Sequence, residues 1–188
     1  KVAFDWAKDL QIAYKHCRSF GFAVQAGGNM GVWPWLLSKK FDQVLTFEPG
    51  TVCWSHLVTN IADSFNVDMR ACALLDRIVQ CEVRNDKPNN LGAQYVVPGL
   101  GQVLATTIDL QMSDQSGCDL IYLDIEGAEL LALRGAAETL NKFHPVVVVE
   151  DNGLSERFGS AKGDVERWLA KEFGYKVVAR PHRDVVLV

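Results

Sequence analysis

The stretch VQAGGNMG at residues 24–31 decides the fold, because an apolar strand pattern breaks there into a glycine-rich turn. The next strand pattern, VLTFEP at residues 44–49, ends in the carboxylate of Glu48. Glycines let a backbone approach a ligand closely, and a carboxylate after the second strand accepts hydrogen bonds from ribose hydroxyls. The two stretches together predict a doubly wound α/β fold that binds a nucleoside cofactor.

Length and composition fit one globular domain over residues 1–188. Hydrophobic residues make up 48% and charged residues 22% of the chain, as in ordinary soluble domains. The net charge of −4 makes nucleic acid an unlikely partner, because phosphate contacts need clustered Lys and Arg. We expect no membrane association, since no apolar run approaches the ~20 residues of a membrane span.

Cysteine and histidine usage bears on compartment and metal binding. The five cysteines are scattered, odd in number and without a CxxC pair, which indicates reduced thiols and a cytoplasmic location. The four histidines lie far apart and show no ligand spacing, so we expect no metal site.

Hydrophobic periodicity predicts alternating strands and helices on either side of a less regular middle segment. The middle predicts strands at 78–84 and 93–97, joined by a polar loop, and a short strand at 103–107. We interpret about 78–107 as a β-hairpin insertion, either on the substrate side or merely extending the sheet. The other expected strands are 22–26, 43–48, 67–74, 119–124 and 145–150, and the expected helices are 4–17, 32–41, 52–64, 128–143 and 164–173.

The last two expected strands, 175–179 and 184–188, discriminate between folds. The link at 180–183 is too short to hold a crossover helix, so the two strands must be antiparallel. A nicotinamide-binding Rossmann domain normally ends in parallel strands, whereas a class I methyltransferase ends in an antiparallel strand. The turn at 27–31 also does not fit GxGxxG. We therefore predict a class I methyltransferase fold: a Rossmann-like, doubly wound sheet, mostly parallel, with a C-terminal antiparallel hairpin strand.

Several segments, in order along residues 20 to 155, resemble the FkbM-type S-adenosylmethionine-dependent methyltransferases. QAGGNMG at 25–31 is similar to that family's D-x-G-A-N-x-G turn, and VLTFEP at 44–49 to its strand ending in F-E-P. The most specific match is DLIYLDIEGAE at 119–129, followed by LRGA at 133–136. PVVVVE at 145–150 fits the strand that follows it.

The resemblance implies S-adenosylmethionine (SAM) as cofactor and a set of residues to bind it. The glycine turn would line the methionine portion, Glu48 would take the ribose hydroxyls, and Ala73 and Leu74 would lie near the adenine. Two positions depart from the family pattern: Gln25 replaces an Asp that supports the cofactor loop, and Tyr122 replaces a Lys. The expected cofactor-binding residues are Gln25, Gly27, Gly28, Asn29, Gly31, Glu48, Ala73, Leu74 and Asp124.

Methyl transfer needs alignment and at most one base, and three carboxylates are candidates for it. Asp124 and Glu126 follow a buried strand, where open α/β sheets place their ligands, and alternation along an extended segment would put both on one side. Glu150, at the end of the next strand, is a further candidate base. The alternative for Glu126 and Glu129 is to stabilise the dipole of the following helix.

The resemblance favours O-methylation of a hydroxyl on a small molecule or glycan. One alternative is a nucleic-acid methyltransferase; DIEG at 124–127 lacks the aromatic–proline motif used on flipped bases, which leaves ribose methylation open. A second alternative is a non-catalytic interaction module built on the cofactor-binding fold.

Overall fold

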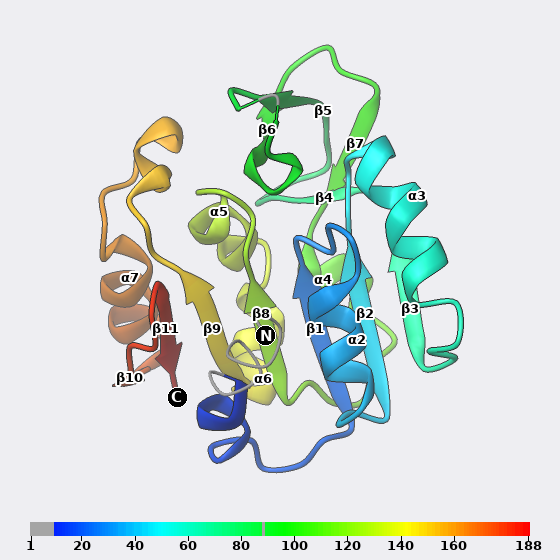
Figure 1. The fold of residues 1–188 in the computed structure, drawn as a ribbon. Coiled ribbons are helices and arrows are strands. Elements are labelled where there is room, and N and C mark those ends of the chain that lie inside the picture. Colours follow the sequence, from blue (N-terminus) through cyan, green and yellow to red (C-terminus); the bar gives the residue numbers. More distant parts are fainter. Residues whose placement is uncertain (1–9, 88) are drawn as a thin grey trace.

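The computed structural model describes residues 10–87 and 89–188 and is built on a seven-stranded sheet (Figure 1). Neighbouring strands are parallel except for the pairs made by β11, which is antiparallel to both of its neighbours. This confirms the mostly parallel sheet with a C-terminal antiparallel strand. The strand order is β10 (Val177–Ala179), β11 (Asp184–Leu187), β9 (Val146–Glu150), β8 (Leu120–Leu123), β1 (Phe22–Ala26), β2 (Gln43–Phe47) and β3 (Val67–Arg70).

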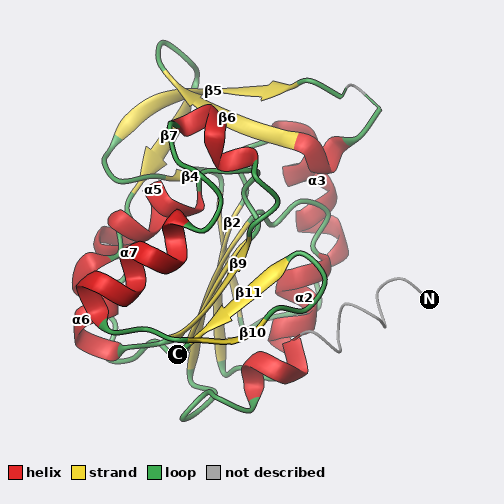
Figure 2. Cartoon of the chain, turned by 90° about the vertical axis from the view of Figure 1, so that its left-hand side faces the viewer, coloured by secondary structure: helices red, strands yellow, loops and turns green. Residues whose placement is uncertain are grey.

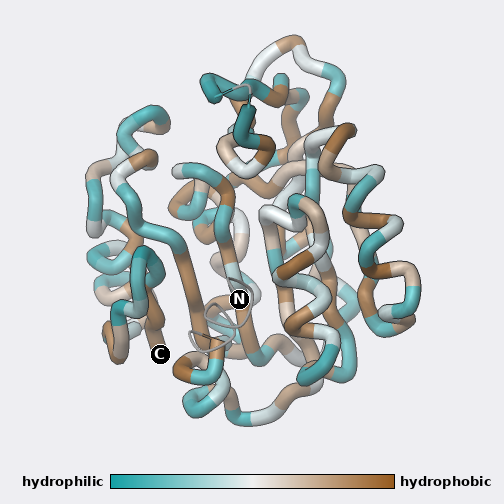
Figure 3. The backbone as a smooth tube through the Cα atoms, viewed as in Figure 1, coloured by the Kyte–Doolittle hydropathy of each residue, from teal (hydrophilic) through white to brown (hydrophobic). Residues whose placement is uncertain are grey.

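Helices cover both faces of this sheet, because successive strand residues point to opposite sides. In β8, Ile121 and Leu123 pack with α4 (Ile108–Gln111), α5 (Glu129–Arg134), α6 (Ala137–Phe143) and α7 (Asp164–Phe173). Leu120 and Tyr122 face the helix at 10–14 and α2 (Val32–Ser38). Figure 3 shows apolar residues along β9 and hydrophilic ones in the loop beyond its carboxyl end.

A second, four-stranded sheet lies above the carboxyl ends of the first (Figure 2). Its order is β4 (Ala73–Leu74), β7 (Val103–Thr106), β5 (Val79–Asn85) and β6 (Gln94–Pro98), with the short η1 (Leu91–Ala93) before β6. β5 pairs antiparallel with both β6 and β7. The middle of the chain therefore builds a separate sheet and does not extend the main one. We call the antiparallel pair β5–β6 the roof hairpin.

Two of the expected elements are wrong in extent. The expected strand 67–74 ends at Arg70, and Ala73–Leu74 pairs with β7 of the second sheet instead. The expected helix 128–143 is broken into α5 and α6 at Gly135. A Cβ at Gly135 would overlap the carbonyl of Leu75, so the backbone at this break packs closely against the residue that follows β4.

The remaining differences are small. α2 ends at Ser38, α3 spans Thr51–Asn60, and η2 (Leu154–Phe158) was not expected. Of the expected helix 4–17, residues 10–14 are helical, and 1–9 lie outside the described residues. All five cysteines are free thiols. Within 10–87 and 89–188, no helix combines the length and apolar character needed to cross a membrane.

Candidate functional site

A cavity of about 900 Å³ opens between the carboxyl ends of the main strands and the roof hairpin. The cavity lining includes the glycine turn and Glu48, which we call the cofactor wall, and Asp124, Glu126 and Glu150, which we call the acidic wall. The roof contributes residues from β4, β5, η1 and β6. The first two strands and the acidic strand ends thus meet in one space.

The glycine turn is held tightly between two strand ends. The amides of Gly27 and Gly28 both donate to the carbonyl of Phe47, at 3.1 and 2.9 Å. Gly27 has φ 82°, and a Cβ there would overlap the backbone carbonyl of Asp124. Only glycine meets both conditions, so the residue fixes the distance between the cofactor wall and the acidic wall.

Glu48 organises the cofactor wall. The carboxylate is buried, 6% exposed, and accepts the amide of Asn29 on Oε2 and the amide of Gly50 on Oε1, both at 2.7 Å. Burial raises the pKa of Glu48, and the two amide hydrogen bonds oppose that rise. Each oxygen keeps a lone pair for a ligand hydroxyl.

The donor set fits an adenosyl cofactor. The Oδ1 atom of Asn29 is buried and has no hydrogen-bond partner among the described residues, which suits a ligand donor. Ala73 and Leu74, both buried on β4, line the roof end of the cavity. The cavity lining therefore combines polar atoms suited to sugar and amino-acid groups with an apolar surface suited to a base.

Two expected cofactor residues are corrected by the structure. Gln25 is fully buried in β1, where Nε2 donates to the Ala26 carbonyl and Oε1 accepts the hydroxyl of Thr46. Gly31 precedes α2, and a Cβ there would press on Ile61. Neither Gln25 nor Gly31 lines the cavity. Strand alternation puts Gln25 on the same sheet face as Ala23 and Tyr122, which α2 covers. Gly31 allows close packing of helices.

Asp124, Glu126 and Glu150 each place a carboxylate oxygen within 4.8 Å of the other two. The route differs from the expected extended segment, because Glu126 is in the left-handed region with φ 56°. Glu126 also precedes α5 and so is not in its first turn. A tight turn, and not strand alternation, brings Glu126 to Asp124.

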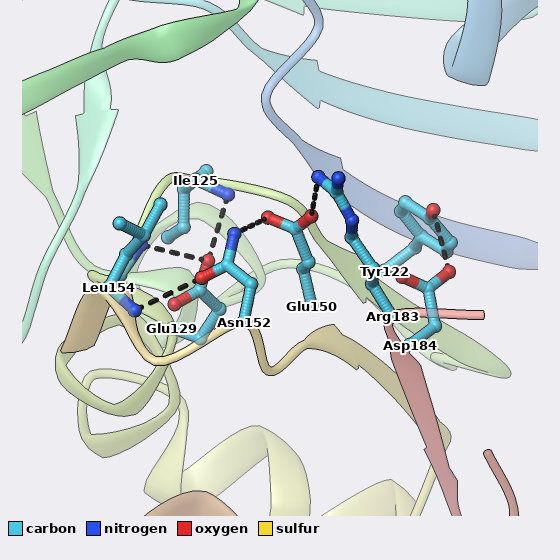
Figure 4. Close-up of polar contacts among 9 residues, drawn as sticks. Tyr122, Ile125, Glu129, Glu150, Asn152, Leu154, Arg183 and Asp184 are labelled. Atoms are coloured by element: carbon cyan, nitrogen blue, oxygen red, sulfur yellow. Dashed lines mark hydrogen bonds and ion pairs between the residues drawn. The ribbon is translucent and has the colours of Figure 1, made fainter. Parts of the chain in front are cut away.

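The carboxyl groups of the acidic wall have raised pKa values. Burial raises the pKa of Asp124, against hydrogen bonds with Trp33 and Glu150. Burial and the neighbouring Asp124 and Glu126 carboxylates raise the pKa of Glu150 to about 8. Asn152 donates to Glu150 Oε2 at 2.6 Å, and Arg183 Nη1 lies 3.7 Å from Oε1 (Figure 4). Asp124 and Glu150 can therefore exchange a proton with a bound hydroxyl.

Glu129 stabilises the backbone of the turn that carries Glu126. It is 3% exposed, and its Oε1 accepts the amides of Ile125 and Gly127 at 3.0 and 3.2 Å (Figure 4). Burial raises the pKa of Glu129 to about 7. Glu129 thus fixes the turn that carries Glu126.

These shifts predict how stability depends on pH. Folding raises the pKa of Glu150 from 4.5 to about 8, so the folded protein binds a proton that the unfolded chain releases. The contribution of Glu150 to the free energy of unfolding is therefore full below 4.5 and is lost as pH rises toward about 8. We expect Glu150→Gln to flatten the decline in urea-unfolding stability between about pH 5 and about pH 8. Glu82→Gln, at an exposed carboxylate, is the control, and an equal slope in wild type and Glu150→Gln would contradict the assignment.

Sequence reasoning missed several lining residues. Tyr122 donates its hydroxyl to Asp184 Oδ2 at 3.1 Å (Figure 4), and its ring lies 4.6 Å from that of Trp33. Arg183 and Asp184 come from the turn before β11 and its first residue. In the sequence, only Tyr122, which stands where the FkbM-type pattern has Lys, indicated that this part of the cavity lining departs from the family pattern.

Comparison with known proteins agrees with the fold. Residues 102–177 match the family model described as the methyltransferase FkbM domain. The sequence matches none of the curated proteins.

Solved structures extend the likeness to the whole chain. A methyltransferase FkbM from Methylobacillus flagellatus KT is similar with a TM-score of 0.58 at 15% identity, over 94% of this chain and 49% of that one. A protein from Streptococcus mutans described as a methyltransferase, in complex with S-adenosylhomocysteine (SAH), has a TM-score of 0.57 at 10% identity, over 96% and 94%. The Methanococcus jannaschii fibrillarin pre-rRNA processing protein has a TM-score of 0.54 at 12% identity, over 95% and 72%.

The chain spans about half the length of the M. flagellatus protein, and likeness at these identities shows the fold alone. The family match is independent of it and includes the acidic turn after β8 and the whole of β9. The protein therefore has a class I methyltransferase fold, and its residues 102–177 are similar to the methyltransferase FkbM domain.

Proposed function

We propose that the protein is a SAM-dependent O-methyltransferase that acts on a hydroxyl of a small molecule or glycan. The observation that carries the proposal is that the glycine turn, Glu48, Asp124 and Glu150 all line the same cavity. A cofactor wall and a proton-accepting wall in one space are what hydroxyl methylation requires.

Different residues of the cavity lining would bind different parts of the cofactor. Gly27, Gly28 and Asn29 would hold the methionine portion, and the free lone pairs of Glu48 would accept the ribose hydroxyls. Ala73 and Leu74 offer an apolar surface to the adenine. The bound cofactor supplies an electrophilic methyl group on a sulfonium.

The acidic wall would handle the acceptor's proton. Asp124 or Glu150, in its deprotonated form, would accept the hydroxyl proton of the acceptor while the acceptor oxygen takes the methyl group from bound SAM. A methyl ether, SAH and a protonated carboxyl group would result. The raised pKa of Glu150 suits proton uptake near neutral pH.

The cavity favours a small acceptor. Its volume of about 900 Å³ is at the upper end of the roughly 300–1,000 Å³ typical of small-molecule sites. Carboxylates on the acceptor side disfavour a phosphate backbone. A sugar, polyol or other neutral hydroxyl compound fits this lining better than nucleic acid.

Calorimetry tests cofactor binding first. We expect wild type to bind both SAM and SAH with one site per chain. Asp124→Asn should change SAH affinity less than it lowers methyl transfer, because its proposed role is with the acceptor proton. If neither SAM nor SAH binds, the protein is an interaction module and the enzymatic proposal fails.

Transfer of a labelled methyl group tests the acceptor. Sugars, polyols, nucleosides and RNA are offered with labelled SAM, and we expect incorporation into a hydroxyl compound that is not a polynucleotide. Glu150→Gln should reduce incorporation, whereas the exposed-site control Glu82→Gln should not. Labelling of RNA alone would overturn the proposed acceptor class in favour of ribose methylation.

A further inference from the structure

Arg157, in η2, contacts two residues of the cavity lining, Tyr95 and Glu126, and also Asp86. Its guanidinium carbon lies 3.9 Å from the centre of the Tyr95 ring. Its Nη2 is 4.0 Å from Asp86 Oδ2, and its Nη1 donates to the backbone carbonyl of Glu126 at 3.4 Å. One side chain thus joins the roof hairpin to the acidic wall.

On the side of the roof hairpin, the residues that Arg157 contacts are hydrogen-bonded to each other. The hydroxyl of Tyr95 donates to Asp86 Oδ1 at 3.0 Å, linking β6 to the loop that leaves β5. Tyr95 also lines the cavity. The arginine therefore stacks on a ring whose orientation is fixed by the same carboxylate that pairs with it.

On the side of the acidic wall, Arg157 contacts a turn with a strained backbone. Glu126 and Gly127 both have positive φ, 56° and 107°, a conformation that is strained for Glu126. A Cβ at Gly127 would crowd the carbonyl of Leu154, so η2 packs directly on this turn. The hydrogen bond from Arg157 adds a second contact from η2 and holds the residue whose carboxylate faces Asp124.

We propose that Arg157 is a positioning residue that clasps the roof hairpin to the Glu126 turn across the mouth of the cavity. The proposal rests on the proposed function in that the cavity is taken to bind SAM and SAH. Ligand passage then requires the contacts of Arg157 with Tyr95, Asp86 and Glu126 to open. Their loss should speed both entry and exit, with little effect on the equilibrium between them.

The test measures the association and dissociation rate constants of SAH by stopped-flow fluorescence. For Arg157→Ala we expect both constants to rise by roughly tenfold, with Kd changed by less than about threefold. Arg157→Lys should recover part of the effect, because it keeps the charge and loses the planar stack. The matched control is Arg84→Ala, an exposed roof arginine paired with Glu82 in its own strand. Rates for Arg157→Ala equal to wild type would overturn the proposal.

A double-mutant cycle separates clasping from a general structural effect. Tyr95→Leu removes the ring beneath the guanidinium and should raise the SAH dissociation rate on its own. The double variant should be no faster than Arg157→Ala, because both changes break one contact. Additive effects in the cycle would contradict a shared contact.

Amide hydrogen exchange without ligand keeps the proposal testable apart from cofactor binding. In Arg157→Ala, the amides of β5 and β6 should exchange faster than in wild type, while those of β8 and β9 stay unchanged. Failure of wild type to bind SAH would remove the proposed function. Unchanged exchange and unchanged SAH rates in Arg157→Ala would remove only the clasp.

Discussion

Replacing Glu48 by alanine is expected to weaken SAH binding by about 100-fold. The carboxylate is buried and oriented by the amides of Asn29 and Gly50, so its free lone pairs face the cavity at no cost in reorganisation. Alanine removes the acceptor for the ribose hydroxyls. It also leaves the two amides without a partner, which loosens the glycine turn.

Two further variants make the result specific. Glu48→Gln keeps one oxygen acceptor and loses the charge, so its SAH affinity should lie between those of wild type and Glu48→Ala. Glu82→Ala, at an exposed carboxylate of the roof hairpin, should bind like wild type. Calorimetry gives Kd, and thermal unfolding checks that Glu48→Ala is folded. Unchanged SAH affinity in a folded Glu48→Ala would remove Glu48 from the cofactor site.

Gly27→Ala is expected to lower the free energy of unfolding by more than about 3 kcal/mol, because it combines two penalties. The positive φ of 82° is strained for alanine, and the new Cβ would overlap the carbonyl of Asp124. Relief of that overlap would separate β1 from the end of β8 and pull the two walls of the cavity apart. Urea unfolding measures the loss, and SAH calorimetry should show lost binding in whatever protein remains folded.

Two other glycines separate the contributions. Gly174 has φ 77° and open space where a Cβ would lie, so Gly174→Ala should cost only about 1 kcal/mol for the backbone. Gly117 lacks both the positive φ and the crowding, and Gly117→Ala should be close to neutral. If Gly27→Ala lowers the free energy of unfolding no more than Gly174→Ala does, the close approach to Asp124 does not contribute to stability.

The main sheet could be predicted because its information is local. Continuous apolar runs such as 120–123 and 146–149 must be covered on both faces, and the short link at 180–183 forces an antiparallel end. The second sheet could not be predicted in the same way. The chain leaves the main sheet after Arg70, and Ala73–Leu74 pairs with β7, a contact between residues distant in sequence.

The residues of the candidate site could likewise be predicted only where local sequence determines their position. Glu48, Asp124 and Glu150 could be named because the carboxyl ends of parallel strands meet at one edge of a sheet. Arg157 and Tyr95 could not, because their contact depends on how η2 packs against the roof hairpin. Gln25 was misplaced because a motif position says which loop a residue enters but not which way its side chain turns.

The position of β11 has a consequence for how the protein is made. This strand follows both β9 and β10 in the sequence, yet it inserts between them, and Arg183 and Asp184 at its start line the cavity. During synthesis, β9 and β10 are therefore made before the strand that joins them in the sheet. The cavity lining at Arg183 and Asp184 is complete only after β11 has inserted between them.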